Sequence, residues 1–314
     1  MIHNVYVLNK KTGEILFHKS FWFTEITERM LKDVIDTIDK LEESEDSIET
    51  EFGIDRLVIH LLNPRDIEIA FAYETFGDLV FLVCGDPSEN EKELLKKATK
   101  IKDHWIKTFG LDRTTPLNED EQREFLVKVN ETVVSLLKIA LIGPGGVGKT
   151  SIVKLVTTGE PTSEYVPTMA PDMRPMGSLV EQIMKGKEIS EKYEWIVLGN
   201  KIIIAWDLPG QEMFRTFWKV YLKDADGVLL VMKSTLQGVI TAKKILDLIK
   251  EYSPNTPVWA IANFQDLPNA LKPDMIERII GIPTFPMVAI DPNRRTEMIR
   301  IIRAIALEKE AAYL

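Results

Sequence analysis

A glycine-rich run that ends in a lysine and a threonine has the clearest chemistry in this sequence. Residues 143–150 read GPGGVGKT and join an apolar strand pattern to a helical one. Such glycines let backbone N–H groups face an anion, and the N-terminus of the following helix adds positive charge. Lys149 is placed to reach the β- and γ-phosphates of a nucleotide, and the Thr150 hydroxyl is placed to bind magnesium. The predicted phosphate-binding residues are Gly143, Gly145, Gly146, Val147, Gly148, Lys149, Thr150 and Ser151.

Three further polar segments follow this loop. Residues 163–168 read SEYVPT, residues 207–212 read DLPGQE after one apolar run, and residues 263–266 read NFQD after another. With the loop, these segments in this order resemble the Ras superfamily of small GTPases over about residues 137–310. The resemblance implies an α/β fold, a P-loop G domain with a mostly parallel sheet, which binds GTP or GDP together with Mg²⁺.

The resemblance also implies roles around the γ-phosphate. Thr168 is the switch threonine, which closes on Mg²⁺ and the γ-phosphate only when GTP is present. The Gly210 N–H contacts the γ-phosphate, and Gln211 orients the attacking water. Tyr165 is a further expected nucleotide contact. The implied metal ligands are Thr150, Thr168 and Asp207, and the implied catalytic residues are Gln211, Lys149 and Thr168.

The segment expected to recognise the base is less regular. Asp266 would accept hydrogen bonds from the guanine N1–H and amino group, which adenine cannot supply, and Asn263 would tie this segment to the phosphate loop. Phe264 stands where the family has lysine, and residues 288–290 read VAI where a Ser-Ala-Lys run is common. Phe264 and Ile290 are expected to sandwich the base, while the Ala289 N–H recognises guanine O6.

The segment before Asp207 is expanded, because Asp207 stands 39 positions after Thr168, more than in compact family members. Leu179, Ile183 and Ile189 within it have the spacing of an added helical element.

Turnover is expected to be slow. Val166 occupies the position at which heterotrimeric α subunits would supply an arginine in cis, so the transition state lacks that charge. Whether an arginine acts in cis, such as Arg174 or Arg215, or in trans from a partner stays open.

The elements that position these segments alternate between strand and helix, which indicates a second domain over residues 135–314. Helical patterns separate the apolar runs, which is typical of a parallel sheet covered on both faces. The predicted strands are Leu137–Ile142, Ile202–Trp206, Gly227–Met232, Val258–Ile261 and Met287–Ile290.

Residues 1–134 predict a smaller α+β domain with the order two strands, one helix, three strands, two helices. Thr24 is the expected N-cap of the first helix, and a break at 116–120 precedes the last one. This succession resembles the longin domain, with a roadblock-like domain as the alternative. The domain offers no metal-ligand spacing, so an interaction surface is expected. The predicted strands are Val5–Leu8, Glu14–His18, Leu57–Leu61, Ile67–Tyr73 and Leu79–Cys84.

Composition narrows the class of protein. The 314 residues carry a formal net charge of -9, which argues against nucleic-acid binding. Cys84 is the sole cysteine and lies in an apolar run, which fits a buried thiol in a cytoplasmic protein. The sequence shows no signal peptide, membrane-spanning stretch or lipidation motif, so membrane contact is expected to be indirect.

These features together predict a regulatory GTP-binding switch, of the trafficking or signalling type, that hydrolyses GTP slowly to GDP with Mg²⁺. Activating and exchange partners are expected. The N-terminal domain is expected to bind a longin- or roadblock-domain partner or to form a homodimer. The alternatives are a GTP-binding scaffold with negligible turnover and a P-loop kinase acting on a small molecule.

Overall fold

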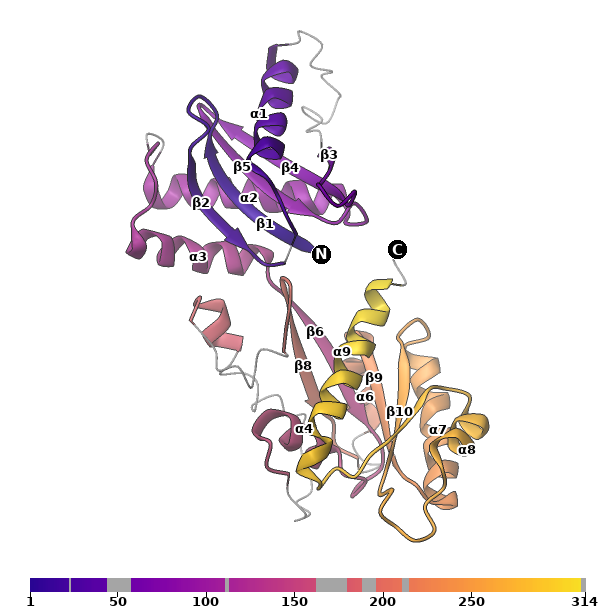
Figure 1. Ribbon diagram of the computed structural model, residues 1–314. Helices are drawn as coiled ribbons and strands as arrows, with labels where there is room; N and C mark the ends of the chain where they lie inside the picture. The colour runs from indigo at the N-terminus through magenta and orange to yellow at the C-terminus, as the bar shows by residue number, and fades with distance from the viewer. Residues whose placement is uncertain are drawn as a thin grey trace. The chain divides into compact units, whose positions relative to one another are not determined.

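Two units make up the chain in a computed structural model (Figure 1). Residues 1–22, 24–43, 58–110, 113–161, 180–187, 196–210 and 215–311 are described. Unit 1 comprises Met1–Ser135, Gln182–Glu188 and Leu198–Lys201. Unit 2 comprises Leu136–Glu181, Ile189–Val197 and Ile202–Leu314.

Unit 1 is built on a five-stranded antiparallel sheet, as the apolar runs predict. The first hairpin turns at Asn9, whose side chain accepts hydrogen bonds from the backbone N–H groups of Lys11 and Thr12 at 3.0 and 3.2 Å. The strands in spatial order are β2 (Ile15–Ser20), β1 (Ile2–Asn9), β5 (Leu79–Gly85), β4 (Glu68–Phe76) and β3 (Val58–Leu62).

Helices cover both faces of this sheet. Successive side chains of a strand point to opposite faces, so Val5 and Val7 join the core under α2 (Glu91–Phe109) and α3 (Glu119–Val133). Tyr6 and Leu8 join a second core under α1 (Glu28–Glu43). The thiol of Cys84 is buried in that second core, as its apolar surroundings in the sequence predict.

The first helix begins later than predicted. It starts at Glu28, and the Oγ1 of Thr27 accepts a hydrogen bond from the Met30 N–H at 3.2 Å. Thr24 is therefore not the N-cap, and its Oγ1 lies 3.0 Å from Nδ1 of His3. A long-range partner for the Thr24 hydroxyl shifts the helix start by one turn.

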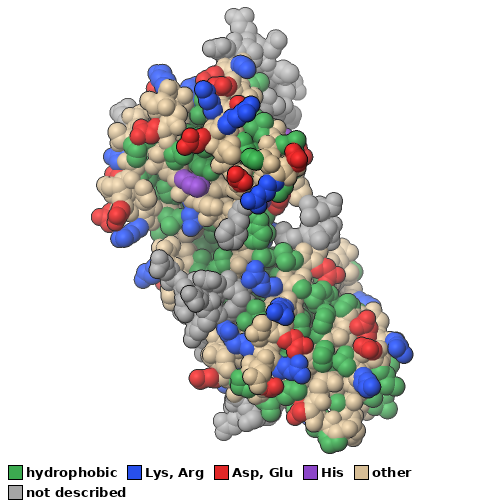
Figure 2. Space-filling model, in the orientation of Figure 1, with side chains coloured by type: hydrophobic (Ala, Val, Ile, Leu, Met, Phe, Trp, Pro, Cys, Tyr) green, Lys and Arg blue, Asp and Glu red, His purple; other side chains and the backbone are tan. Residues whose placement is uncertain are grey.

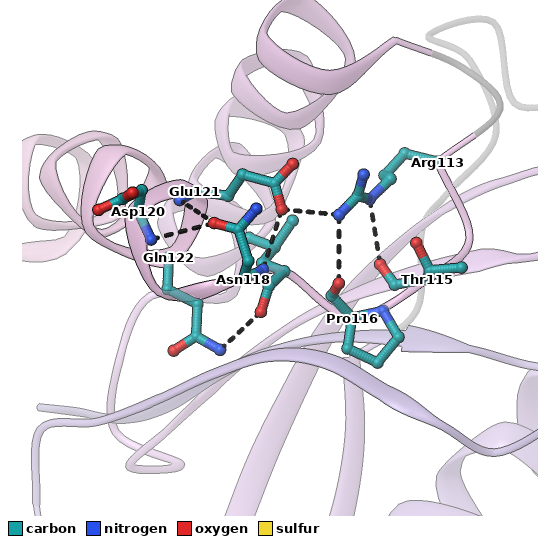
Figure 3. A network of polar contacts seen from close by, with 8 residues as sticks. Arg113, Thr115, Pro116, Asn118, Asp120, Glu121 and Gln122 are labelled. Atoms are coloured by element: carbon teal, nitrogen blue, oxygen red, sulfur yellow. Dashed lines mark hydrogen bonds and ion pairs between the residues drawn. The ribbon is translucent and has the colours of Figure 1, made fainter.

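The break predicted at 116–120 contains the start of α3, which is formed by a capping box. The Asn118 side chain accepts from the N–H groups of Asp120 and Glu121, and the Glu121 carboxylate accepts from the Asn118 N–H (Figure 3). Arg113 donates to the same carboxylate at 2.7 Å and to two backbone carbonyls, which fixes the approach to α3.

Unit 2 contains a six-stranded sheet. The pairs β10–β11, β9–β10 and β6–β9 are parallel. The helices are α4 (Lys149–Thr158), α6 (Arg215–Lys223), α7 (Leu236–Tyr252), α8 (Pro273–Ile280) and α9 (Arg295–Ala311), with a 3₁₀ turn at Pro292–Arg294. The strands in spatial order are β11 (Thr284–Pro286), β10 (Val258–Asn263), β9 (Gly227–Lys233), β6 (Ser135–Ile142), β8 (Lys201–Asp207) and β7 (Val197–Leu198).

The last strand lies three residues before its predicted place. Met287–Ile290 is not a strand, although Met287 and Ala289 are buried. The Met287 N–H still donates to Ala262, but the chain then turns, and the Asp291 N–H donates to the Val288 carbonyl. The apolar run therefore forms a turn in which Met287 and Ala289 are buried and Ile290 is exposed.

No helix in the described ranges is both long and apolar enough to cross a membrane. Residues 180–184 of the expanded segment are helical, while Leu179 and Ile189 lie outside the described residues.

Candidate nucleotide-binding site

The phosphate loop lies between the end of β6 and the start of α4. Gly148 is the N-cap of α4 and has a φ of 96°. A Cβ on Gly148 would lie 2.3 Å from Nδ2 of Asn263, and one on Gly143 would lie 2.1 Å from the Val231 carbonyl oxygen. The loop therefore packs too closely on its neighbours for a side chain at either position, and α4 presents its N-terminus beside it.

Lys149 is buried within this loop, with only 6% of the residue exposed. Its Nζ donates hydrogen bonds to the carbonyls of Gly143 and Pro144 at 2.9 and 3.0 Å. Burial lowers the pKa of Lys149 to about 8, and the charge of Asp207 opposes that shift. A buried ammonium held by loop carbonyls is suited to an anionic ligand, because phosphate oxygens supply the opposite charge.

Two oxygen ligands meet next to the lysine. Asp207 ends β8 and is buried, and the Thr150 hydroxyl donates to its Oδ2 at 2.5 Å. Magnesium prefers hard oxygen donors such as a hydroxyl and a carboxylate, so this pair fits the ion. Among the described residues, no cluster of three or more His, Cys, Asp or Glu side chains could hold a metal.

The segment after Asp207 lies against the loop. A Cβ on Gly210 would be 2.5 Å from Lys149 Nζ and 2.6 Å from the Gly143 carbonyl oxygen, so only glycine fits there. The buried indole of Trp218 donates to the Pro209 carbonyl at 3.0 Å. Trp218 lies on α6, so this hydrogen bond ties the backbone of Pro209, the neighbour of Gly210, to that helix.

Asn263 joins the base side of the site to the phosphate loop. Its Nδ2 donates to the Val147 carbonyl and its Oδ1 accepts from the Ala289 N–H, both at 2.9 Å. The Ala289 N–H, expected to face guanine O6, is thus used within the protein. Asp266 is exposed, and half of Ile290 is exposed at 50%.

Phe264 has a φ of 64°, a left-handed conformation that is uncommon for a bulky residue. The ammonium of Lys233 lies 5.3 Å from the centroid of its ring, which is within the range of a cation–π contact. A cation therefore lies beside the aromatic ring that replaces the family's lysine.

Most residues of the candidate site lie within a segment that resembles a known protein family. Residues 138–266 match the family model described as "Ras of Complex, Roc, domain of DAPkinase". ADP-ribosylation factor-like protein 8b of Arabidopsis thaliana is 26% identical over 152 residues, which cover 48% of this chain and 72% of the relative. ADP-ribosylation factor-like protein 2 of the same plant is 29% identical over 48% of this chain and 71% of its own length.

ADP-ribosylation factor-like protein 4A of Homo sapiens is 36% identical over 93 residues, which cover 28% of this chain and 46% of that protein. These similarities support a Ras superfamily G domain.

The described part of the candidate site brings together Lys149, Thr150, Asp207 and Gly210. A separate hydrogen bond ties Asn263 to Val147. Tyr165, Thr168 and Gln211 lie outside the described residues, so their roles stay predictions.

Sequence reasoning missed Ser234 and Gln265 in the G domain. The buried Ser234 hydroxyl donates to the Asn263 carbonyl at 2.6 Å, and the Gln265 amide donates to Ser234 Oγ at 2.6 Å and to the Leu271 carbonyl at 3.1 Å. A small polar residue directly after a buried strand, at the carboxyl edge of a parallel sheet, was the available signal.

Proposed function

We propose that this chain is a GTP-binding regulatory switch that hydrolyses GTP slowly to GDP in the presence of Mg²⁺. The observation that carries the proposal is the meeting of a buried lysine, a threonine hydroxyl and a buried carboxylate around the N-terminus of α4. The family match over residues 138–266, which contain these side chains, and the similarity to ADP-ribosylation factor-like proteins support it.

In this mechanism the loop and Lys149 bind the phosphate oxygens. Thr150, Asp207 and Thr168 would hold magnesium, which would neutralise phosphate charge. Asn263 fixes the loop that carries Asp266, which accepts hydrogen bonds from guanine. Gln211 orients a water for attack on the γ-phosphorus, with GDP as the leaving group. Loss of the γ-phosphate then releases Thr168 and Gly210, which is the switch.

For unit 1 we propose an interaction role, as a longin-like or roadblock-like domain that binds a partner or a second copy of the chain. Figure 2 shows Lys and Arg side chains interspersed with Asp and Glu on one face of the molecule. That mixture and the net charge of -9 favour protein contacts over nucleic acid. Activating and exchange partners in the cytoplasm belong to the same proposal.

The test is single-turnover GTP hydrolysis by the full chain, with GDP and inorganic phosphate quantified. Without a partner we expect a rate on the order of 10⁻⁴ to 10⁻² per second, because no arginine stands at the cis position. Gln211→Leu should lower this rate at least about tenfold while GTP affinity stays nearly constant, since its side chain acts on water.

No phosphate release by wild type would leave a nucleotide-dependent scaffold. Transfer of the phosphoryl group to an added metabolite would indicate a kinase instead.

A further inference from the structure

The expanded segment before Asp207 contributes two stretches to unit 1, although unit 2 precedes and follows them in sequence. These stretches are Gln182–Glu188 and Leu198–Lys201. The second one leads directly into β8, the strand that ends at Asp207.

Asn200 is the centre of the second stretch. It is buried, with 5% of the residue exposed. Its Oδ1 accepts from the Ile2 N–H and its Nδ2 donates to the Val133 carbonyl, both at 2.9 Å. Its own carbonyl accepts from the Ser135 N–H at 3.0 Å. One asparagine thus joins the first strand of unit 1, the end of α3 and the start of β6.

Close packing fixes the backbone next to Asn200. Gly199 has a φ of 61°, and a Cβ there would lie 2.4 Å from Met1 Sδ and 3.2 Å from Trp22 Cε3. The positive φ and these close neighbours make glycine the residue that fits directly before Asn200.

The first stretch is held by similar chemistry. The buried side chain of Asn130 donates to the carbonyls of Ile183 and Met184, each at 3.2 Å. A Cβ on Gly186 would lie 2.6 Å from Leu126 Cδ2. Both stretches therefore contact α3 of unit 1.

The strands that leave Asn200 lead to the nucleotide site. β6 begins at Ser135 and ends just before the phosphate loop, and β8 begins at Lys201 and ends at Asp207. They are neighbours in the sheet, and at their far ends the Leu208 N–H donates to the Leu141 carbonyl at 3.3 Å. The Asn200 carbonyl therefore joins the starts of the two strands whose ends carry the loop and the carboxylate. The Asn200 side chain holds this junction through Ile2 and through Val133, two residues before Ser135.

We propose that Asn200 is a positioning residue for Asp207: by holding the start of β8 to Ile2 and Val133 through its side chain, it sets where the Asp207 carboxylate stands relative to Thr150. This effect passes along β8, which begins at Lys201 and ends at Asp207. This inference rests on the proposed function, because it needs Asp207 to serve a bound Mg²⁺–nucleotide.

The experiment measures GDP dissociation from the full chain with excess Mg²⁺ and again with a chelator. In wild type, chelation should accelerate release. In Asn200→Ala we expect release with Mg²⁺ to be about tenfold faster and release with chelator to be unchanged, so the ratio of the two rates falls about tenfold.

The matched control is Asn118→Ala. Asn118 caps α3 in the same unit through two backbone hydrogen bonds, at a site apart from β8. Its loss should lower the melting temperature without altering the ratio. The proposal would be overturned if Asn200→Ala folds and its ratio of the two GDP release rates equals that of wild type. It would also be overturned if the ratio falls equally in Asn118→Ala.

A measurement on wild type covers the case in which Asn200→Ala does not fold. Coupling is reciprocal, so Mg²⁺ added to the GDP-bound protein should slow hydrogen exchange of the Ser135 amide, and unchanged exchange would refute the positioning role.

If wild type binds no GDP, the proposed function fails and this inference with it. If GDP binds and the ratio holds, only the inference fails.

Discussion

The two units use buried asparagines differently. In unit 1, Asn9 and Asn63 accept hydrogen bonds from backbone N–H groups two to four positions further along the chain and so shape turns. In unit 2, Asn263 bonds to residues 116 and 26 positions away and joins two loops of the nucleotide site. A buried amide with distant partners marks a place where loops must be held together for function.

Asn130 and Asn200 do not follow this division, because both belong to unit 1 and yet bond to distant residues. The partners of Asn130 lie 53 and 54 positions away, and those of Asn200 lie 198 and 67 positions away. Asn200 directly precedes β8, and the positioning role that we propose for it would serve the candidate nucleotide site. The comparison therefore separates asparagines by the reach of their contacts rather than by unit.

Removing the buried charge of Lys149 in unit 2 should have the largest effect. Lys149→Ala is expected to weaken GDP binding by more than about 100-fold, because a desolvated polyphosphate would lose its cationic partner. Isothermal titration of GDP with Mg²⁺ measures this change. Lys154→Ala is the control, since Lys154 is exposed on the same helix. Equal affinities for the two variants would remove Lys149 from the phosphate site.

Two asparagine variants, one in each unit, test whether only the asparagine of unit 2 serves nucleotide binding. Asn263→Ala and Asn9→Ala each delete two side-chain hydrogen bonds to backbone, with an expected cost of about 1–3 kcal/mol in unfolding free energy. Only Asn263→Ala should also weaken GDP binding, by at least about tenfold, because it separates the phosphate loop from the base loop. Denaturant melts and GDP titrations supply both numbers, and a similar loss of affinity in Asn9→Ala would erase the distinction.

The smallest effect is expected at Asp86 in unit 1. Burial acts to raise the pKa of this carboxyl, but hydrogen bonds and charge from His3 and the Met1 amine lower it from 3.8 to about 2. Because the folded pKa is the lower one, the contribution is present above about pH 4 and is lost as the pH falls toward 2. With the side chain 37% exposed, solvent screening limits it to about 1 kcal/mol.

Melting temperatures of wild type and Asp86→Asn at pH 5, 4, 3 and 2 check this expectation. The difference between the two proteins should shrink as the pH falls. A difference that stays constant over this range would mean that the carboxylate charge adds nothing to stability.

The sequence predicted the elements whose apolar pattern is local and long. All five strands of unit 1 and the strands β6, β8, β9 and β10 lie on the expected runs, because burial on one or both faces leaves a direct trace in the residues. The strand predicted at 287–290 was wrong, because apolar residues such as Met287 and Ala289 are buried in a turn as well as in a strand.

Long-range contacts were beyond prediction. Thr24 caps no helix, and its hydroxyl instead lies within hydrogen-bond distance of His3. The sequence contains no spacing pattern that predicts this pair. The bonds of Asn200 to Ile2 and Val133 depend on the packing of segments that are distant in the chain. The phosphate loop was predictable because its function requires contiguous residues, whereas a positioning residue needs only to be near in space.

The central claim is that unit 2 binds a guanine nucleotide with magnesium, and equilibrium competition between GDP and ADP on the full chain tests it most directly. With Mg²⁺ present, we expect GDP to bind at least about tenfold more tightly than ADP, because adenine would leave the Asp266 carboxylate unpaired. Asp266→Ala should abolish that preference. Equal binding of GDP and ADP by wild type, or binding of neither, would contradict the account.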